Sequence, residues 1–218
     1  MFRIISRLIF LLLIILLPKK AFSEVSSTNT VVNLSMIPGF GYVSMTSSGK
    51  YPSLESNNYS FSLEAEFNNT NIVRMSYEQF AAEKYYTSEN TNYRIQTLNT
   101  LITFYSLWKF ADSKWNGINL GVGAGTQYGY SDYTTQNLPN ENIPYWGFNT
   151  LLMIEYYHKV LKDVYITASL SGRWALLHHM YNDPLAIALW WFMQSSGYQQ
   201  ISIGIKWRFT GFVYHYED

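Results

Sequence analysis

The sequence contains no cysteine, which excludes a lipoprotein attachment site, a disulfide framework and a metal site built from thiolates. Beyond residue 23 no run approaches 18 consecutive apolar residues, so that part holds no candidate transmembrane helix. Basic residues are few there: 15 Lys and Arg less the four within residues 1–23 leave 11, against 15 acids. A balance of −4 lacks the basic surface that nucleic-acid binding requires, so no nucleic-acid partner is expected.

The first residues have the pattern of an export signal. Two arginines precede an apolar run from Leu8 to Leu17, and Ala21-Phe22-Ser23 offers small residues at the positions that a signal peptidase reads. The run is about ten residues long, well short of the ~20 that a membrane-spanning helix needs. We therefore expect residues 1–23 to be a cleaved signal peptide and residues 24–218 to form one exported domain.

Aromatic residues are abundant, with 19 Tyr, 13 Phe and 7 Trp in the chain. Tyr and Trp combine an apolar body with a polar atom, and they are enriched where a protein meets both lipid and water. Because no helix candidate remains in the exported domain, this composition favours a membrane protein built from strands.

Alternation of apolar and polar residues, interrupted by turn signals, divides the exported domain into eight candidate strands. They cover residues 31–45, 59–67, 72–84, 93–108, 117–130, 145–158, 163–178 and 198–209. Three connections are short (68–71, 111–116 and 159–162), and four are longer and polar (46–58, 85–92, 131–144 and 179–197). Long loops at one end and short periplasmic turns at the other are typical of an outer-membrane barrel. The predicted fold is all-β, an eight-stranded antiparallel up-and-down transmembrane β-barrel.

The faces of several candidate strands can be assigned from the alternation. In residues 59–67, Phe and Leu alternate with Ser and Glu, and in residues 117–130 apolar residues alternate with glycines. We expect the apolar faces to meet lipid and the polar, small-residue faces to fill a narrow lumen. The segment 93–108 alternates poorly, and its faces stay unassigned.

The last candidate strand ends in a recognisable pattern. Ser202, Gly204, Trp207 and Phe209 fit the form polar-x-Gly-x-x-aromatic-x-aromatic, which is the assembly signal in the last strand of bacterial outer-membrane barrels. With the export segment, the strand count and the loop asymmetry, residues 31–209 resemble the small eight-stranded barrels that include outer membrane proteins A, X and W. The resemblance implies a bacterial outer-membrane location, contact with membrane lipid and lipopolysaccharide, and insertion by the barrel assembly machinery.

The chain departs from these barrels at its end, because residues 210–218 follow the aromatic terminus. Either this tail lies in the periplasm, or the last strand runs on through Val213. The sequence leaves both alternatives open.

Extending the face assignment predicts a network of charged side chains inside the barrel. It contains four acids and four bases, namely Glu64, Glu66, Arg74, Glu78, Glu155, Arg173, Lys206 and Arg208. An eight-stranded barrel is only wide enough to be filled by side chains, which excludes a general porin. Charges confined there must pair, because desolvation otherwise costs several kcal/mol per ion. We expect a sealed polar lumen without catalytic residues, metal ion or cofactor.

The last long connection carries candidate chemistry of its own. His178, His179 and Asp183, with Ser195 or Ser196, could supply the base, orienting acid and nucleophile of acyl transfer. Some small outer-membrane barrels are lipid A acyltransferases or deacylases, so a lipid A-modifying enzyme is one alternative. However, the His-x-Ser arrangement of the deacylase type is missing, and adjacent histidines on a strand point to opposite faces. The alternative interpretation is that the histidines are polar residues at the wet end of a strand.

The apolar run from Leu185 to Met193 follows Asp183-Pro184, a pair that favours a helix start. The run is either a short helix in the lipid interface, with Trp190 and Trp191 at headgroup level, or an extension of the last strand. A further alternative is a narrow conduit for small hydrophobic solutes, which would require apolar lumen residues near the mouth. Our main hypothesis is a non-enzymatic barrel with a structural, adhesive or surface-interaction role and an extracellular ligand.

Overall fold

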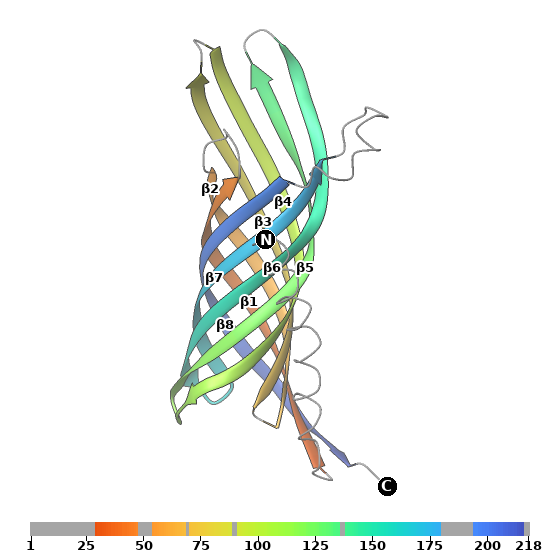
Figure 1. Ribbon diagram of the computed structural model, residues 1–218. Helices are drawn as coiled ribbons and strands as arrows, with labels where there is room; N and C mark the ends of the chain where they lie inside the picture. Colours follow the sequence, from red (N-terminus) through yellow and green to blue (C-terminus); the bar gives the residue numbers. More distant parts are fainter. Residues whose placement is uncertain are drawn as a thin grey trace, which may run out of the picture.

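The computed structural model describes residues 29–47, 54–68, 70–88, 91–135, 138–179 and 194–215, which form a closed all-β barrel (Figure 1). Its strands are β1 Asn29–Ser47, β2 Leu54–Phe67, β3 Asn71–Ser88, β4 Thr91–Asp112, β5 Asn116–Thr135, β6 Leu138–Leu161, β7 Val164–His179 and β8 Gln194–His215. Each strand pairs antiparallel with the next, and β1 pairs with β8 to close the barrel. The predicted fold class and all eight strands are confirmed, whereas the predicted signal peptide at residues 1–23 lies outside the described residues.

Four strands continue well beyond the others. The β3–β4 ladder runs to the pair Ser88 and Thr91, and the β5–β6 ladder runs to Thr135 and Leu138, so most of the predicted loops 85–92 and 131–144 are strand. Strands β3 to β6 therefore rise above the rim as a four-stranded sheet, while β1, β2, β7 and β8 end lower (Figure 1). Tyr, Thr and Ile are frequent in these segments, and such residues favour extended backbone.

At the end of the barrel with the short turns, the structure shows where residues 210–215 lie. Strand β8 continues to His215, and its residues Gly211 and Val213 pair with Asn33 and Val31 of β1. The last strand therefore runs on past the aromatic residues, as the second of the two sequence alternatives states. Both described chain ends lie at the end of the barrel that carries the short turns (Figure 1).

The outside of the barrel is apolar over most of its height. Among the described side chains, seven of the strands, all except β5, expose several large apolar side chains, among them Phe40, Phe61, Leu63, Val73, Met75, Ile102, Phe104, Leu152, Ile154, Ile166, Leu170, Ile201, Ile203 and Ile205. Aromatic residues border this belt: Tyr128 and Phe148 towards the projecting sheet, and Tyr156 and Trp207 towards the short turns. Trp146, whose ring centre lies 5.6 Å from that of Phe148, precedes Tyr156 by ten positions on β6, which at ~3.3 Å per residue and ~40° tilt gives ~25 Å. That is the height of a transmembrane belt.

No helix among the described residues has the length and apolar character needed to cross a bilayer.

Candidate functional site: the lumen ion network

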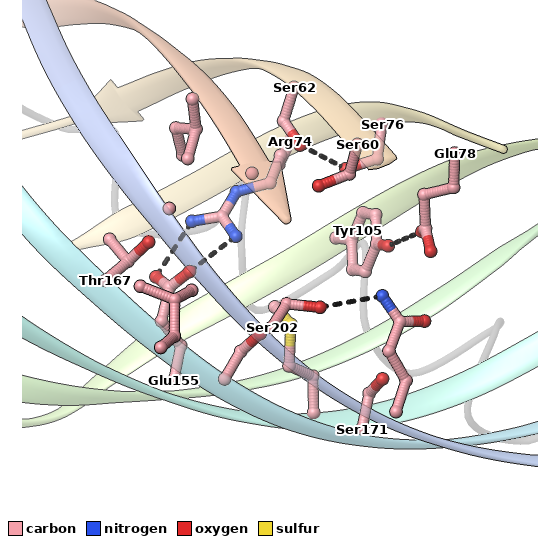
Figure 2. A pocket seen from close by; sticks show the side chains of 17 residues that line it. Ser60, Ser62, Arg74, Ser76, Glu78, Tyr105, Glu155, Thr167, Ser171 and Ser202 are labelled. Atoms are coloured by element: carbon pink, nitrogen blue, oxygen red, sulfur yellow. Dashed lines mark hydrogen bonds and ion pairs between the residues drawn. The ribbon is translucent and has the colours of Figure 1, made fainter. Parts of the chain in front are cut away.

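The network is centred on Arg74, which bridges two strands that face each other across the lumen. Arg74 Nε and Nη2 donate to Glu64 Oε2 at 3.0 and 2.6 Å. Its Nη1 and Nη2 donate to Glu155 Oε2 and Oε1 at 2.6 and 2.8 Å (Figure 2). Lys206 contacts the other oxygen of Glu64, and Asn119 donates to Glu155 Oε1 at 3.0 Å. One guanidinium and one ammonium group thus hold β2, β3, β6 and β8 together.

Glu66 forms a second group, one layer closer to the short turns. Its side chain is buried and receives two charged hydrogen bonds: Lys109 Nζ donates to Oε1 and Arg208 Nη2 to Oε2, both at 2.8 Å. Lys206 Nζ lies 3.9 Å from Oε2. The ring of Tyr165 lies in the same layer and makes cation–π contacts with both basic side chains. Arg208 and Lys206 lie 5.2 and 5.8 Å from its ring centre.

Glu78 forms the third group, on the side nearer the projecting sheet. Arg173 Nη2 and Tyr105 Oη donate to Glu78 Oε1 at 2.7 and 2.8 Å. Asn58 Nδ2 approaches Oε2 at 3.5 Å. All four of these side chains are buried, so the carboxylate is bonded by protein donors in place of water.

A small cavity separates the Arg74 and Glu78 groups (Figure 2). Its volume is about 40 Å³, enough for a few water molecules. Its lining is rich in hydroxyl groups, from Ser60, Ser62, Ser76, Thr167, Ser169, Ser171 and Ser202. Two of these hydroxyls are paired with each other, since Ser62 and Ser76 lie 2.5 Å apart. The cavity is therefore a hydroxyl-rich space between the two ion groups.

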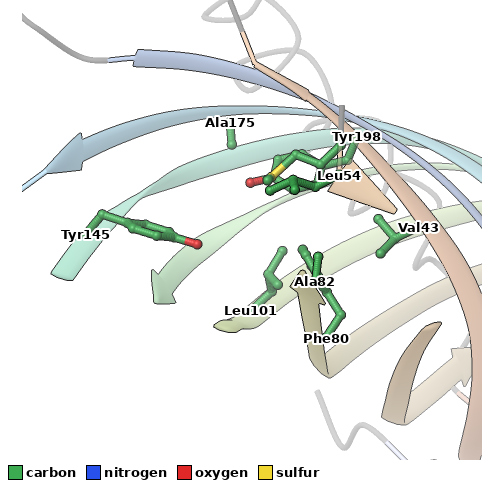
Figure 3. Packing of buried hydrophobic residues seen from close by; sticks show 9 residues of the cluster. Val43, Leu54, Phe80, Ala82, Leu101, Tyr145, Ala175 and Tyr198 are labelled. Atoms are coloured by element: carbon green, nitrogen blue, oxygen red, sulfur yellow. The ribbon is translucent and has the colours of Figure 1, made fainter. Parts of the chain in front are cut away.

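Above the Glu78 group the lumen becomes apolar. Its buried cluster consists of Val43, Met45, Leu54, Phe80, Ala82, Leu101, Tyr145, Ala175 and Tyr198 (Figure 3). Gln127 lies beside the cluster, and its Nε2 donates to Asn99 Oδ1 and Tyr198 Oη, both at 2.6 Å. The described lumen is therefore polar in the middle of the barrel and apolar in this outer part.

The apolar cluster coincides with a reversal of polarity in the wall. On β3, Glu78 points inward and Tyr77 outward, but two residues later Phe80 points inward and the polar Gln79 outward. Tyr198 and Gln199 of β8 are arranged in the same way. In water, a barrel wall is expected to turn its apolar side chains inward and its polar side chains outward. In lipid, the apolar side chains can face outward and the polar ones inward. The reversal marks the level at which the barrel leaves an apolar environment.

All eight charged residues predicted from the sequence lie in the lumen, and each belongs to a salt bridge of one of the three groups. Sequence reasoning missed Lys109, because the predicted strand stopped at residue 108 and a bulge follows at Lys109 to Ala111. It also missed Tyr105, because the faces of 93–108 were unassigned. The inward series Thr103, Tyr105, Leu107 was the available signal, since those side chains are all buried.

The remaining sequence candidates lie elsewhere. Trp207 and Phe209 of the assembly signal point outward and stack with ring centres 6.2 Å apart, while Gly204 points inward and Ser202 lines the cavity. The backbones of His178 and His179 end β7, and Ser195 and Ser196 pair with Leu176 and Ala175. Asp183 and the apolar run to Met193 lie outside the described residues.

The chain matches no protein-family model and no curated protein, but solved structures share its fold. Ail, the attachment invasion locus protein of Yersinia pestis, is similar with a TM-score of 0.50 and 13% identity, over 82% of this chain and 98% of that chain. A major outer membrane protein from Thermus thermophilus reaches 0.51 at 10% identity, over 82% and 99%. Neisserial surface protein A reaches 0.46 at 11%, over 84% and 98%. At such identities the likeness concerns the barrel fold alone.

Proposed function

We propose that this chain, a small eight-stranded barrel of the outer-membrane type, is a non-enzymatic outer-membrane protein with a closed lumen and a structural or adhesive role at the cell surface. The observation that carries the proposal is the division of the barrel into three zones. An apolar belt surrounds a polar ion network, a polarity reversal follows, and a polar four-stranded sheet projects beyond it. This order fits a barrel that spans lipid and presents β3 to β6 to the outside.

Closure of the lumen is supported by the way its charges are used. Each of the four buried carboxylates is held by Arg or Lys, so no acid in the network remains available as a general base. The apolar cluster follows above, with its members at 0–8% exposure. Ions would have to separate buried pairs and then cross an apolar layer, and both steps are costly.

The closed lumen can be tested in planar bilayers. The purified full chain should insert without producing conductance steps above those of the protein-free bilayer. Stepwise conductance of the inserted wild-type chain would refute closure. Lipid A from cells with and without the protein should also have the same acyl-chain masses, and a shift in those masses would refute the non-enzymatic role.

The surface role rests on the projecting sheet. A bilayer-spanning barrel does not need β3 to β6 to continue beyond the rim, so the extra strand length serves another purpose. The outward face of this extension carries Tyr85, Arg94 and Glu83, which interact with one another: Tyr85 Oη and Arg94 Nε donate to Glu83 Oε1 at 2.6 and 2.5 Å. Exposed tyrosine beside polar partners is typical of protein contact surfaces.

Hairpin shortening tests this role. One variant replaces residues 84–95 by a tight turn, and a second does the same for residues 133–141. Cells that display the wild-type chain should attach to surfaces or to one another more strongly than cells with either variant, provided that folding and amount at the surface are equal. Equal attachment by all three chains would leave a purely structural role in the membrane.

A narrow conduit for small hydrophobic solutes is the second candidate, favoured by the apolar residues near the lumen mouth. Vesicles containing the wild-type chain would then take up an apolar dye faster than empty vesicles. Trimming the cluster with Phe80→Ala should increase that uptake further. Uptake equal to that of empty vesicles for both chains would exclude the conduit.

Assembly by the barrel assembly machinery is part of the same proposal. Outward-facing Trp207 and Phe209 on the closing strand would be accessible to a partner before β8 pairs with β1. Phe209→Ala should lower the amount of folded protein in cells, while leaving folding of the purified chain into vesicles intact. Phe61→Ala, an exposed aromatic on β2, serves as the matched control.

A further inference from the structure

Two neighbouring β-bulges near the short turns each expose one apolar residue. The register of β4 with β5 shifts between Lys109 and Ala111, and that of β6 with β7 between Lys159 and Leu161. The residues skipped by these ladders are Phe110 and Val160, which are 72% and 46% exposed. A bulge redirects a side chain, so both positions are turned outward.

Lysines accompany the bulged residues on two neighbouring turns. Lys159 precedes Val160, Lys162 lies in the turn between β6 and β7, and Lys114 lies in the turn between β4 and β5. The two turns touch, because the Lys159 N–H donates to the Trp115 carbonyl oxygen at 2.6 Å. None of the three lysines has a carboxylate partner within the described part of the chain. Three ammonium groups are thus gathered on adjoining turns.

An aromatic ring holds one of these ammonium groups near the surface, since Lys114 Nζ lies 5.4 Å from the ring centre of Trp115. Lys159 pairs with the buried Tyr165 on the inward face of the wall, and its Nζ lies 5.9 Å from that ring centre. Such contacts position a cation without neutralising its charge. Trp115 is itself 55% exposed, so its ring is available to the surroundings.

Acidic residues of these turns offset part of the positive charge. The Asp112 carboxylate is already occupied, because Tyr157 Oη donates to its Oδ1 at 2.6 Å and Lys109 Nζ lies 3.4 Å from its Oδ2. Asp163 is the other acid described in the two turns. Towards the projecting sheet, by contrast, Arg94 is paired with Glu83. Positive charge without a carboxylate partner therefore accumulates on the short-turn side.

We propose that these two turns form a binding site for anionic phospholipid headgroups, in the leaflet that surrounds the short-turn end. Lys114 and Lys162 contact the phosphates, while Phe110 and Val160 enter the boundary between headgroups and acyl chains. The inference rests on the membrane location proposed above. It adds a lipid preference to that location, through residues that the lumen network does not use.

A phospholipid fits this surface better than a soluble anion does. A soluble anion could neutralise the lysines, but it would leave Phe110, Val160 and Leu161 exposed to water. A phospholipid can contact the lysines through its phosphate and cover the apolar side chains with its acyl chains. Lysines near a lipid surface bury their hydrocarbon stems and direct their charge to phosphate. The combination of Lys with adjacent exposed apolar residues therefore favours a phospholipid over a soluble anion.

The experiment compares lipids retained by the purified full chain. Micelles with equal amounts of phosphatidylglycerol and phosphatidylcholine are exchanged onto the protein, and native mass spectrometry reports which lipid stays bound. Wild type should retain phosphatidylglycerol in excess, and each of Lys114→Gln and Lys162→Gln should lower that excess by up to about fivefold. Arg94→Gln, the matched control on the projecting sheet, should leave it unchanged.

Two further arms separate the other outcomes. Phe110→Ala should reduce the total lipid retained while keeping the phosphatidylglycerol preference, and complete displacement by glycerol phosphate would mean a soluble-anion site and overturn the proposal. Equal retention of the two lipids by wild type would also overturn it. A chain that fails to insert into phosphatidylcholine vesicles at all would instead refute the proposed membrane function.

Discussion

Glu64 and Arg74 face one another as direct neighbours on β2 and β3, and the same guanidinium reaches across the lumen to Glu155. The first contact joins two residues of one hairpin, whereas the second joins strands that do not pair in the wall. Arg74 therefore connects local structure to the closed barrel. Its bidentate hold on Glu155 uses the planar fork that distinguishes Arg from Lys.

Replacing Arg74 by Leu should destabilise the barrel by about 3–5 kcal/mol, because Glu155 would stay buried without any of its present charge partners. Arg74→Lys should cost less, since it keeps the charge but loses the fork. The free energy of unfolding is measured by urea titration of the chain in vesicles, with tryptophan fluorescence as the signal.

Arg94→Gln is the control, because it removes an Arg–Glu pair of the exposed sheet. Exposed ion pairs contribute little, so the unfolding midpoint should hardly move. If Arg74→Leu lowers the midpoint no more than Arg94→Gln does, the lumen network is not a source of stability.

Tyr105→Phe should cost about 1–3 kcal/mol, because it removes one of the donors to the buried carboxylate of Glu78. Tyr85→Phe removes a similar hydroxyl contact to Glu83, but on the exposed face of the projecting sheet. Solvent replaces that donor, so little change is expected. The two variants are compared by the same urea titration, and equal effects would contradict the distinction between the lumen and the exposed sheet.

Much of the lumen could be predicted because a strand has a period of two. Once Ser60 and Ser62 were assigned inward, Glu64 and Glu66 followed, and a short turn brought Arg74 opposite Glu64. The contacts between distant strands could not be predicted. Whether Arg74 reaches Glu155 depends on the stagger of strands around the barrel, which no local pattern encodes.

Two other failures have separate physical causes. Lys109 pairs in the regular register just before the bulge at Phe110, and it was missed because the predicted strand ended one residue too early. The apolar outer cluster was missed because a single rule, polar side inward, was applied along the whole strand. That rule holds in lipid, but Phe80 and Gln79 follow the rule for water, where the apolar side turns inward.

Gly125→Ala should strongly reduce folding, because the added Cβ would run into the Ile102 carbonyl oxygen and lie 2.7 Å from the Thr103 Cα on β4. Backbone atoms of a paired strand cannot move aside as a flexible side chain could. Gly172→Ala is the matched control: a Cβ there meets nothing within 4 Å. The folded fraction in vesicles is measured by the shift in gel mobility on heating. Equal folding of the two variants would contradict this account of the β5 glycines.

Asp112 should make the barrel sensitive to acid. The residue lies at the short-turn end, beyond the apolar belt. Burial alone would raise its pKa, but the hydrogen bond from Tyr157 and the charge of Lys109 outweigh it and hold the pKa below its ordinary value. The folded state therefore binds fewer protons than the unfolded state just below the unfolded pKa of ~3.9. The stabilisation is present above that pH and is lost as the pH falls through the folded pKa.

Asp112→Asn should accordingly lower stability at neutral pH and flatten the fall in unfolding free energy between pH ~4 and more acidic conditions. Tyr157→Phe should act in the same direction, because it removes a donor that favours the ionised carboxylate. Urea titrations at a series of pH values provide the measurement, and Ser113→Ala in the adjoining turn accounts for general effects of substitution there. A pH profile of Asp112→Asn parallel to that of wild type would show that this carboxylate does not couple folding to protons.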